Sequence, residues 1–295
     1  MIKKILPVIS IILGCVLWGL AIVLTKKTIN ELIFPHLAMY RFIIASIVFI
    51  PFVKKKTLPS INKSDIKYFI YTGFLTVPCT FLLQFAGISF TSSTNASLIV
   101  GMTPTVFIIM SYILFRKKEN KTTILAVILS VIGILIVVGS PSSENNWLGN
   151  FLIIISLITL SLSAITSQNL MKTYSPLTTT ILTFWLGTFL LIPSVIYFYG
   201  LPSINLNNNL ITSICFQGIF CTSLAYFLWN YGLQKIPIAK AGIYANIEPI
   251  AGILFTTLLL SEKITLQIAI GGILVIISAV AISIIDFYNF KKMKK

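Results

Sequence analysis

Acidic residues and histidine are scarce in this chain of 295 residues: Asp and Glu together number 7, and there is 1 histidine. An intramembrane hydrolase or transferase is expected to cluster His, Asp or Glu side chains that move protons and activate nucleophiles. Glycine-rich loops of the kind that cradle phosphate groups are also missing from the sequence. We therefore predict that the protein is not an enzyme and does not use ATP directly.

The sequence also lacks a pattern of metal ligands. Its 4 cysteines, Cys15, Cys79, Cys215 and Cys221, do not have metal-ligand spacing. All of them fall within apolar stretches, where cysteine packs as a small apolar residue. We therefore expect no metal ion and no cofactor.

Charged residues make up only 10% of the chain, against roughly a quarter in an ordinary soluble domain. Hydrophobic residues make up 57%, and the mean hydropathy is +0.97. A soluble domain of this size needs a polar surface that so apolar a chain does not supply. The shortage of charge therefore excludes an ordinary soluble fold and indicates that lipid is the solvent.

Apolar stretches of about 17–25 residues recur along the chain, and each has the length of a helix that crosses a hydrocarbon layer roughly 30 Å thick. Breaks that are polar or contain Pro, Gly or Asn separate them. The sequence therefore predicts an all-α integral membrane protein with ten transmembrane helices. Their expected ranges are 5–24, 35–53, 66–88, 94–115, 122–139, 148–171, 176–199, 209–234, 238–260 and 265–285.

Lysine and arginine number 22, giving a net charge of +15, and their distribution predicts the topology. An even number of helices puts both termini on one side; if that side is the cytoplasm, only Lys26, Lys27 and Lys263 lie in outer segments. We predict a multi-pass protein of the cell membrane with both termini cytoplasmic. The basic charge then reflects topology and attraction to anionic inner-leaflet lipid, and not binding of nucleic acid. The 18 basic residues on the cytoplasmic side are Lys3, Lys4, Lys54, Lys55, Lys56, Lys63, Lys67, Arg116, Lys117, Lys118, Lys121, Lys172, Lys235, Lys240, Lys291, Lys292, Lys294 and Lys295.

The two halves of the chain resemble each other at a shift of 145 residues. A sparse set of identities aligns: Gly73 with Gly218, Leu83 with Leu228, Gly87 with Gly232, Ala96 with Ala241, Pro104 with Pro249 and Lys118 with Lys263. The expected helices 1–5 thereby map onto helices 6–10. Because five is odd, two such units cross the membrane in opposite senses and form an inverted repeat. We expect a first repeat at 1–139, an external linker at 140–147, and a second repeat with a basic cytoplasmic tail at 148–295.

Short motifs recur across both halves of the chain. The second half carries Ala225-Tyr226-Phe227-Leu228-Trp229-Asn230-Tyr231-Gly232-Leu233, Ala239-Lys240-Ala241-Gly242, Asn246-Ile247-Glu248-Pro249 and Leu258-Leu259-Leu260-Ser261-Glu262. The first half carries Trp18-Gly19, Tyr40-Arg41-Phe42 and Thr103-Pro104. Together these motifs resemble the EamA family of the drug/metabolite transporter superfamily. The resemblance implies a ten-helix carrier of small metabolites, often an exporter of amino acids, with a central cavity lined mainly by helices 3, 4, 8 and 9.

Glu248 is the candidate for proton coupling because we expect it about ten residues into the ninth helix, near the bilayer midplane. An acidic side chain there costs roughly 2.5–3.5 kcal/mol on insertion scales, so it must face protein or water. Proton uptake removes that charge; alternatively, Glu248 is a protonated structural residue bonded to a neighbouring helix. The matched prolines Pro104 and Pro249 predict kinks that expose backbone carbonyls, although proline kinks are also packing devices.

Side chains that share helix faces are the candidates for binding a small-molecule substrate. Tyr226 and Trp229 share a face on the eighth helix, and Tyr244 shares one with Glu248 on the ninth. Aromatic walls with few polar groups are typical of small-molecule sites, although these aromatics are equally consistent with packing. In the first half the candidates are Thr80, Gln84 and Asn95, of which the two amides are alternatively hydrogen-bonding contacts between helices.

Arg41 is expected about two turns into the second helix, near its outer end. Its guanidinium either reaches the lipid headgroups, pairs with Glu31, or contacts substrate as part of an outer gate.

Together these features favour a secondary transporter that moves small metabolites by alternating access, with amino-acid export as the best single guess and proton coupling as an option. The alternatives are a flippase for lipid or lipid-linked substrates in the same superfamily, and a membrane sensor or scaffold that transports nothing. A flippase needs a lateral opening, whereas a metabolite carrier needs an enclosed polar cavity. The sequence identifies neither the solute, the direction, the coupling ion nor an oligomeric state.

Overall fold

The computed structural model describes residues 2–53, 61–116, 121–139, 146–202, 206–236, 244–262 and 264–293. Every regular element in these ranges is a helix, which agrees with the all-α prediction. The first half contains α1 (Ile2–Ile29), α2 (Phe34–Val48), η1 (Ile50–Phe52), α3 (Lys63–Phe74), η2 (Leu75–Phe81), α4 (Leu82–Phe90), α5 (Ser93–Val100), α6 (Thr103–Phe115) and α7 (Lys121–Val138). The second half contains α8 (Trp147–Leu170), α9 (Pro176–Tyr199), α10 (Asn208–Phe216), η3 (Gln217–Leu224), α11 (Ala225–Lys235), α13 (Ile247–Leu260) and α14 (Leu266–Met293).

In this part of the chain, seven helical runs are long and apolar enough to cross a membrane. An eighth crossing requires α5 and α6 to count as one broken span, because they are bent by about 40°. Two shorter apolar helices, Ile247–Leu260 and Leu266–Ala281, are also present. The seven runs are Ile5–Ile29, Phe34–Phe52, Lys63–Phe90, Lys121–Val138, Trp147–Leu170, Pro176–Tyr199 and Asn208–Lys235.

The molecule places apolar side chains on its outside and many hydroxyl groups inside. Leu135, Phe189 and Leu258 are about two-thirds or more exposed, whereas residues such as Thr72, Ser156 and Thr222 are fully buried. Helices in lipid gain nothing by hiding leucine from the solvent, and small polar residues between them allow close packing and hydrogen bonds. The structure therefore describes a multi-pass membrane protein.

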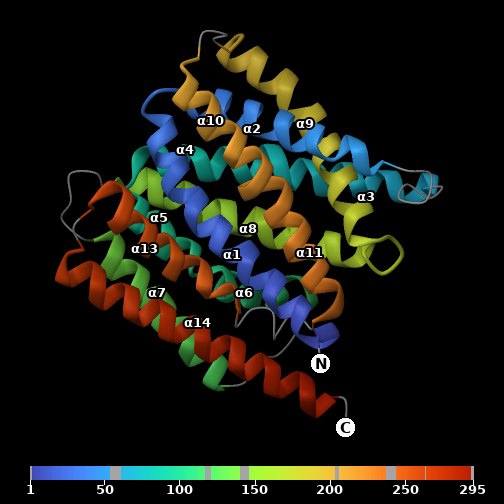
Figure 1. The fold of residues 1–295 in the computed structure, drawn as a ribbon. Coiled ribbons are helices and arrows are strands. Elements are labelled where there is room, and N and C mark those ends of the chain that lie inside the picture. Colours follow the sequence, from blue (N-terminus) through green and yellow to red (C-terminus); the bar gives the residue numbers. More distant parts are fainter. Residues whose placement is uncertain are drawn as a thin grey trace.

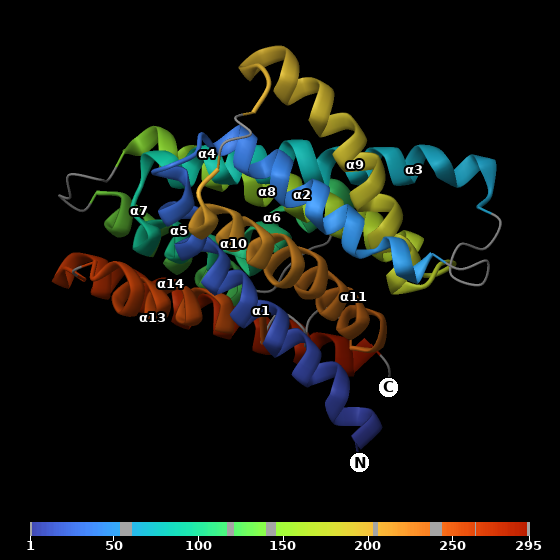
Figure 2. The same cartoon turned by 45° about the horizontal axis from the view of Figure 1, so that its top comes forward.

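Helix α1 crosses the middle of the molecule and packs against α11 and α13 (Figures 1 and 2). Helix α8 packs in the same manner against α4, α5 and α6, while α3 lies along α9 and α2 lies along η3. The pair α7 and α14 forms one edge of the assembly. Both views place the start of α1 and the end of α14 at the same end of the molecule.

Two predicted helices differ from the structure where glycine and proline interrupt them. The expected helix 94–115 is two helices, because α5 ends before Gly101 and α6 begins at Thr103 with Pro104 in its first turn. The expected helix 238–260 is described only from residue 244, and α13 begins at Ile247. Pro104 lies in the first turn of α6, beside the bend of about 40° between α5 and α6. Pro249 lies in the first turn of α13, where the N–H that proline lacks has no helical partner.

Two other spans widen locally into π-helical turns, η2 and η3. Pro78 lies inside η2 and removes one backbone donor. In both turns hydroxyl groups bond the carbonyl five residues earlier: Thr80 donates to Leu75 O at 2.8 Å, and Thr222 donates to Gln217 O at 2.9 Å. These turns lie beside the central cavity described next, in line with the frequent use of π-turns at functional sites.

Candidate functional site

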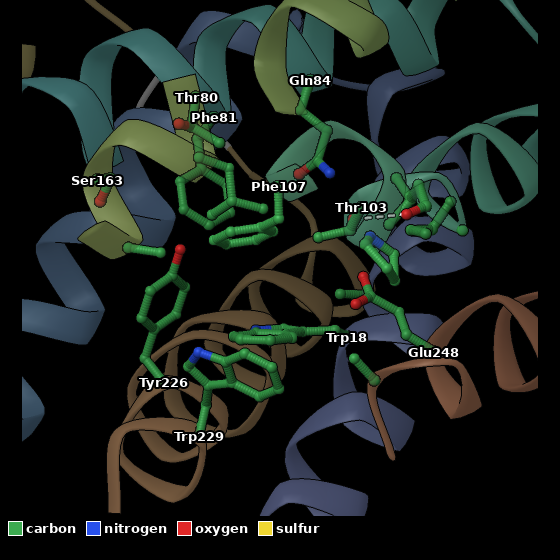
Figure 3. A pocket seen from close by; sticks show the side chains of 18 of the residues that line it. Trp18, Thr80, Phe81, Gln84, Thr103, Phe107, Ser163, Tyr226, Trp229 and Glu248 are labelled. Atoms are coloured by element: carbon green, nitrogen blue, oxygen red, sulfur yellow. Dashed lines mark hydrogen bonds between the residues drawn. The ribbon is translucent and has the colours of Figure 1, made fainter. Parts of the chain in front are cut away.

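A cavity of about 90 Å³ lies between the helices at the centre of the molecule. Side chains from α1, α2, α4, α5, α6, α8 and α11 line it, together with the η2 turn and with Ala245, Asn246 and Glu248. More than half of these side chains are aromatic or aliphatic, and most of the others carry hydroxyl, amide or charged groups (Figure 3). Typical pockets for small molecules measure roughly 300–1,000 Å³, so the cavity is narrow in this conformation.

Glu248 brings a carboxyl group into this cavity from the first turn of α13. In Figure 3 the carboxyl group points toward Thr103 on one side and lies near the Trp18 ring on the other. The titratable side chains that interact with it electrostatically are Cys15 and Tyr226, a thiol and a phenol. Among the described residues, only Glu248 and Arg41 bring ionisable charge to the cavity lining.

A close crossing of α1 and α13 positions Glu248 beside Trp18. A Cβ atom added at Gly19 would lie 2.7 Å from both Glu248 O and Gly252 N. One added at Gly252 would likewise meet the Ser97 side chain on α5. Only glycine allows backbones to approach this closely, so these positions fix how near the carboxyl group lies to α1.

The interruption between α5 and α6 faces the start of α13. Pro104 leaves Val100 O without its usual helical donor, and the Thr103 hydroxyl donates to that oxygen at 2.6 Å. A Cβ atom added at Gly101 would lie 3.3 Å from the Pro249 ring. The two helix starts therefore pack against each other at the cavity, one presenting a threonine hydroxyl and the other a carboxyl group.

Aromatic rings form the wall opposite these helix starts (Figure 3). The Trp18 ring centroid lies 5.1 Å from that of Tyr226 and 5.4 Å from that of Trp229. Tyr226 also contacts Phe184 at 5.0 Å and Phe81 at 6.0 Å. Tilted and edge-to-face contacts of this kind hold rings in place, so the wall is a packed surface and not a set of mobile side chains.

Arg41 reaches the cavity from α2 and is 1% exposed. It donates hydrogen bonds to Thr222 Oγ1, to Thr25 Oγ1 at 3.2 Å and to Cys221 O at 3.3 Å. This position contradicts two of the expected roles, reaching the headgroups and pairing with Glu31. Glu31 instead accepts a hydrogen bond from Asn207 at 2.9 Å.

The model of the EamA-like transporter family matches residues 5–139 and 147–284. The chain belongs to this family. This EamA-like transporter is 28% identical over 267 residues to an "Uncharacterized transporter" of Archaeoglobus fulgidus, which covers 88% of this chain and 92% of the relative. It is 22% identical over 241 residues to the biotin transporter of Escherichia coli, which covers 80% of this chain and 79% of that protein.

A solved structure shares the fold of this EamA-like transporter. A crystal structure of another protein superposes with a TM-score of 0.65 at 13% identity, covering 92% of this chain and 94% of that one. At this identity the likeness concerns the fold alone. The family and the named relatives are transporters, which agrees with the prediction that this protein is not an enzyme.

The structure brings some of the predicted site residues together in the cavity and leaves others outside it. Thr80, Gln84, Tyr226, Trp229, Glu248, Arg41 and Pro104 line the cavity. Their role in binding stays a prediction. The Thr80 hydroxyl already bonds Leu75 O and Thr159, which leaves Gln84 as the freer polar group from that segment.

Three predicted residues lie elsewhere. Asn95 is fully buried in α5, near the Ser92 cap. Tyr244 precedes α13, packs against the apolar cluster around Ile11 and is not among the residues that line the cavity. Pro249 packs behind the cavity lining, against Gly101.

Sequence reasoning missed several residues that line the cavity, notably Phe107 on α6 and Ser163 and Ser167 on α8. The serines are four residues apart, so they share a helix face, and this spacing was a usable signal. Phe107 is one apolar residue among many in its span, and no periodicity distinguishes it. Trp18 carried a family motif, and the structure adds that it lies between Glu248 and the aromatic wall.

At the end of the molecule where α13 stops, Glu262 ties α13 to α5. Its carboxylate accepts hydrogen bonds from Ser93 N at 3.0 Å, Thr94 N at 3.1 Å and Thr94 Oγ1 at 2.7 Å. A carboxylate at a helix N-terminus satisfies donors that have no helical partner. Glu262 therefore caps α5 from the end of α13. Lys117, which aligns with Glu262 at the shift of 145 residues, lies outside the described residues.

Proposed function

We propose that this EamA-like transporter exports amino acids or closely related small metabolites across the cell membrane by alternating access, as a secondary carrier. The observation that supports this most directly is the central cavity, which combines an aromatic wall with isolated polar and charged groups. Trp18 adds a buried N–H group for which the described residues supply no acceptor. Small polar solutes with an apolar side chain match such a lining, because few polar groups then need a partner.

The proposal includes ten spans arranged as two inverted repeats, 1–139 and 148–295. The first helix of each repeat packs against the third and fourth helices of the other repeat. Helix α1 packs on α11 and α13, and α8 packs in the corresponding way on α4 and on α5 with α6. Glycines related by the shift of 145 residues support the same swap. A Cβ atom added at Gly87 would lie 2.7 Å from Gly149 O on α8, and one added at Gly232 would lie 3.0 Å from Pro7 O on α1.

Proton coupling through Glu248 is part of the proposal. Among the described residues, no lysine or arginine lies within ion-pair distance of the Glu248 carboxyl group. Protonation is therefore the available way to neutralise its charge in the cavity. The other groups that interact with it, Cys15 and Tyr226, are neutral in their ordinary forms. Protonation and release then accompany exposure of the cavity to one side and the other.

Transport assays test the function. We expect cells that express the protein to enrich their medium in one or more amino acids relative to cells that lack it, as measured by metabolite profiling. Purified protein in liposomes should then move that solute when tested against a panel of amino acids, with biotin included because a distant relative is named a biotin transporter. Unchanged export in cells together with no transport of any panel member would overturn the proposal.

We predict cytoplasmic termini, and cysteine labelling in intact cells tests this topology. In a variant without native cysteines, Leu201→Cys should react with a membrane-impermeant maleimide, because Leu201 follows α9 at the proposed outer end and is 78% exposed. Ser64→Cys, at the start of α3, should react only after permeabilisation. Labelling of Ser64→Cys in intact cells would contradict both the topology and the orientation of the repeats.

A further inference from the structure

Arg41 is a buried cation without a carboxylate partner among the residues that the structure describes. The guanidinium is almost fully buried, and no Asp or Glu in those ranges lies within ion-pair distance of it. Buried charges in proteins are normally paired, because removing an ion from water costs several kcal/mol. A buried cation that borders a cavity and has no carboxylate partner among these residues is therefore a candidate for binding an anion.

Neutral oxygens hold the guanidinium in place. Thr222 Oγ1, Thr25 Oγ1 and Cys221 O accept hydrogen bonds from it, and Gln217 Oε1 accepts a longer one from Arg41 NH1 at 3.5 Å. Gln217 is itself fixed, because its Nε2 donates to Thr28 at 3.0 Å and to Ser213 at 3.2 Å. These contacts orient Arg41 rigidly, but hydroxyl, amide and carbonyl oxygens leave its charge uncompensated.

The geometry also leaves the guanidinium donor capacity. Arginine has five N–H groups, and these four contacts occupy one on Nε, two on NH1 and one on NH2. The rings of Phe81 and Phe85 lie 5.7 Å and 5.1 Å from its central carbon and border the same cavity. An oxygen anion in the cavity would gain a charge-assisted hydrogen bond in a largely apolar site.

We propose that Arg41 binds the carboxylate of the transported solute, an inference that rests on the proposed function. The solute then supplies the counter-ion that the described residues do not provide, and the carrier discriminates against neutral and purely cationic analogues. Arg41 and Glu248 line the same cavity without forming an ion pair with each other. One carboxylate on Arg41 and one proton on Glu248 are therefore compatible with a single loaded state.

The first test needs no knowledge of the solute and uses the fluorescence of Trp18 and Trp229, which line the cavity. The full-length protein is prepared with Trp147→Phe and Trp185→Phe so that these two tryptophans report. Iodide is the anionic quencher and acrylamide the neutral one. We expect the iodide quenching constant to fall at least severalfold in Arg41→Gln, while the acrylamide constant stays within the error of the wild-type value.

Two variants control this result. Arg116→Gln removes an exposed arginine at the end of α6 and should leave both quenching constants unchanged. Arg41→Lys keeps the charge and should retain most of the iodide quenching. Equal iodide quenching with and without the Arg41 charge, or no iodide quenching of the cavity tryptophans in the parent protein, would overturn the proposal.

The second test compares acids with their amides on protein that keeps Arg41, so it does not depend on the folding of a variant. Each amino acid of a panel, and biotin, is paired with its carboxamide, and binding is measured by the same fluorescence. We expect the acid to bind at least tenfold more tightly than the amide, and the difference to vanish in Arg41→Gln. An amide that binds as tightly as its acid would overturn the role of Arg41 and leave the transport function standing. No binding of any pair, with selective iodide quenching retained, would instead count against the proposed solute class while supporting the anion site.

Discussion

Replacing Glu248 by Gln should abolish the accumulation of solute driven by a pH gradient while leaving folding and solute binding nearly intact. Glutamine has almost the same size and still accepts a hydrogen bond, but it does not titrate. Because no cation is within ion-pair distance of Glu248 among the described residues, its charge state is expected to follow its access to water. A permanently neutral side chain removes the proton from the cycle without removing the cavity.

The measurement uses liposomes that contain the purified protein, with an imposed pH gradient of either sign. Wild-type protein should concentrate the solute, whereas Glu248→Gln should only equilibrate it. Glu31→Gln is the matched control, because Glu31 is exposed at the end of the molecule and its carboxylate accepts a bond from Asn207. If Glu248→Gln still concentrates solute in response to the gradient, Glu248 is a structural or solute-contacting residue and coupling lies elsewhere.

The coupling site is expected to be single because the two helix starts carry different chemistry. The counterpart of Glu248 at the shift of 145 residues is Thr103, which has no titratable group. Its hydroxyl is already engaged with Val100 O, where it replaces the donor that Pro104 lacks. One half therefore contributes a backbone cap and the other a titratable carboxyl group.

The helices were predictable from sequence because hydropathy reports directly on contact with lipid. Pro104 predicted a kink, but the end of α5 before Gly101 was not predictable, because the mean hydropathy of this apolar stretch is unaffected by the bend. The start of α13 was not predictable for the same reason. Because α13 begins at Ile247, Glu248 lies in its first turn and not in the middle of a long helix. The spacing that paired Tyr244 with Glu248 assumed one continuous helix, and Tyr244 is not among the residues that line the cavity.

The site residues divide along similar lines. Tyr226 and Trp229 were found by helical spacing, and Gln84 was found as the counterpart of Trp229 at the shift of 145 residues; all three line the cavity. Arg41 was misplaced because counting turns gives depth along a helix and says nothing about its neighbours. The polar residues that surround it, Thr25 and Gln217, come from segments distant in sequence, and only the fold brings them together.

Gly19→Ala should impair transport far more than its effect on stability explains. The added methyl group would lie 2.7 Å from backbone atoms of Glu248 and Gly252, which have no side-chain freedom with which to move away. Overpacking of this kind typically costs about 1–3 kcal/mol, and relieving it requires α1 and α13 to separate. That separation moves the Glu248 carboxyl group away from Trp18 and changes the cavity itself.

Gly187→Ala provides the matched comparison, because its added methyl group would lie 2.6 Å from Gly73 O at the crossing of α9 and α3. Neither Gly187 nor Gly73 lines the cavity. Both variants should lower the thermal unfolding midpoint of the purified protein by a similar few degrees, but transport per folded molecule should fall at least tenfold only in Gly19→Ala. Equal transport by the two variants would show that the crossing at Gly19 serves stability alone, because a displaced Glu248 is the one consequence that the two substitutions do not share.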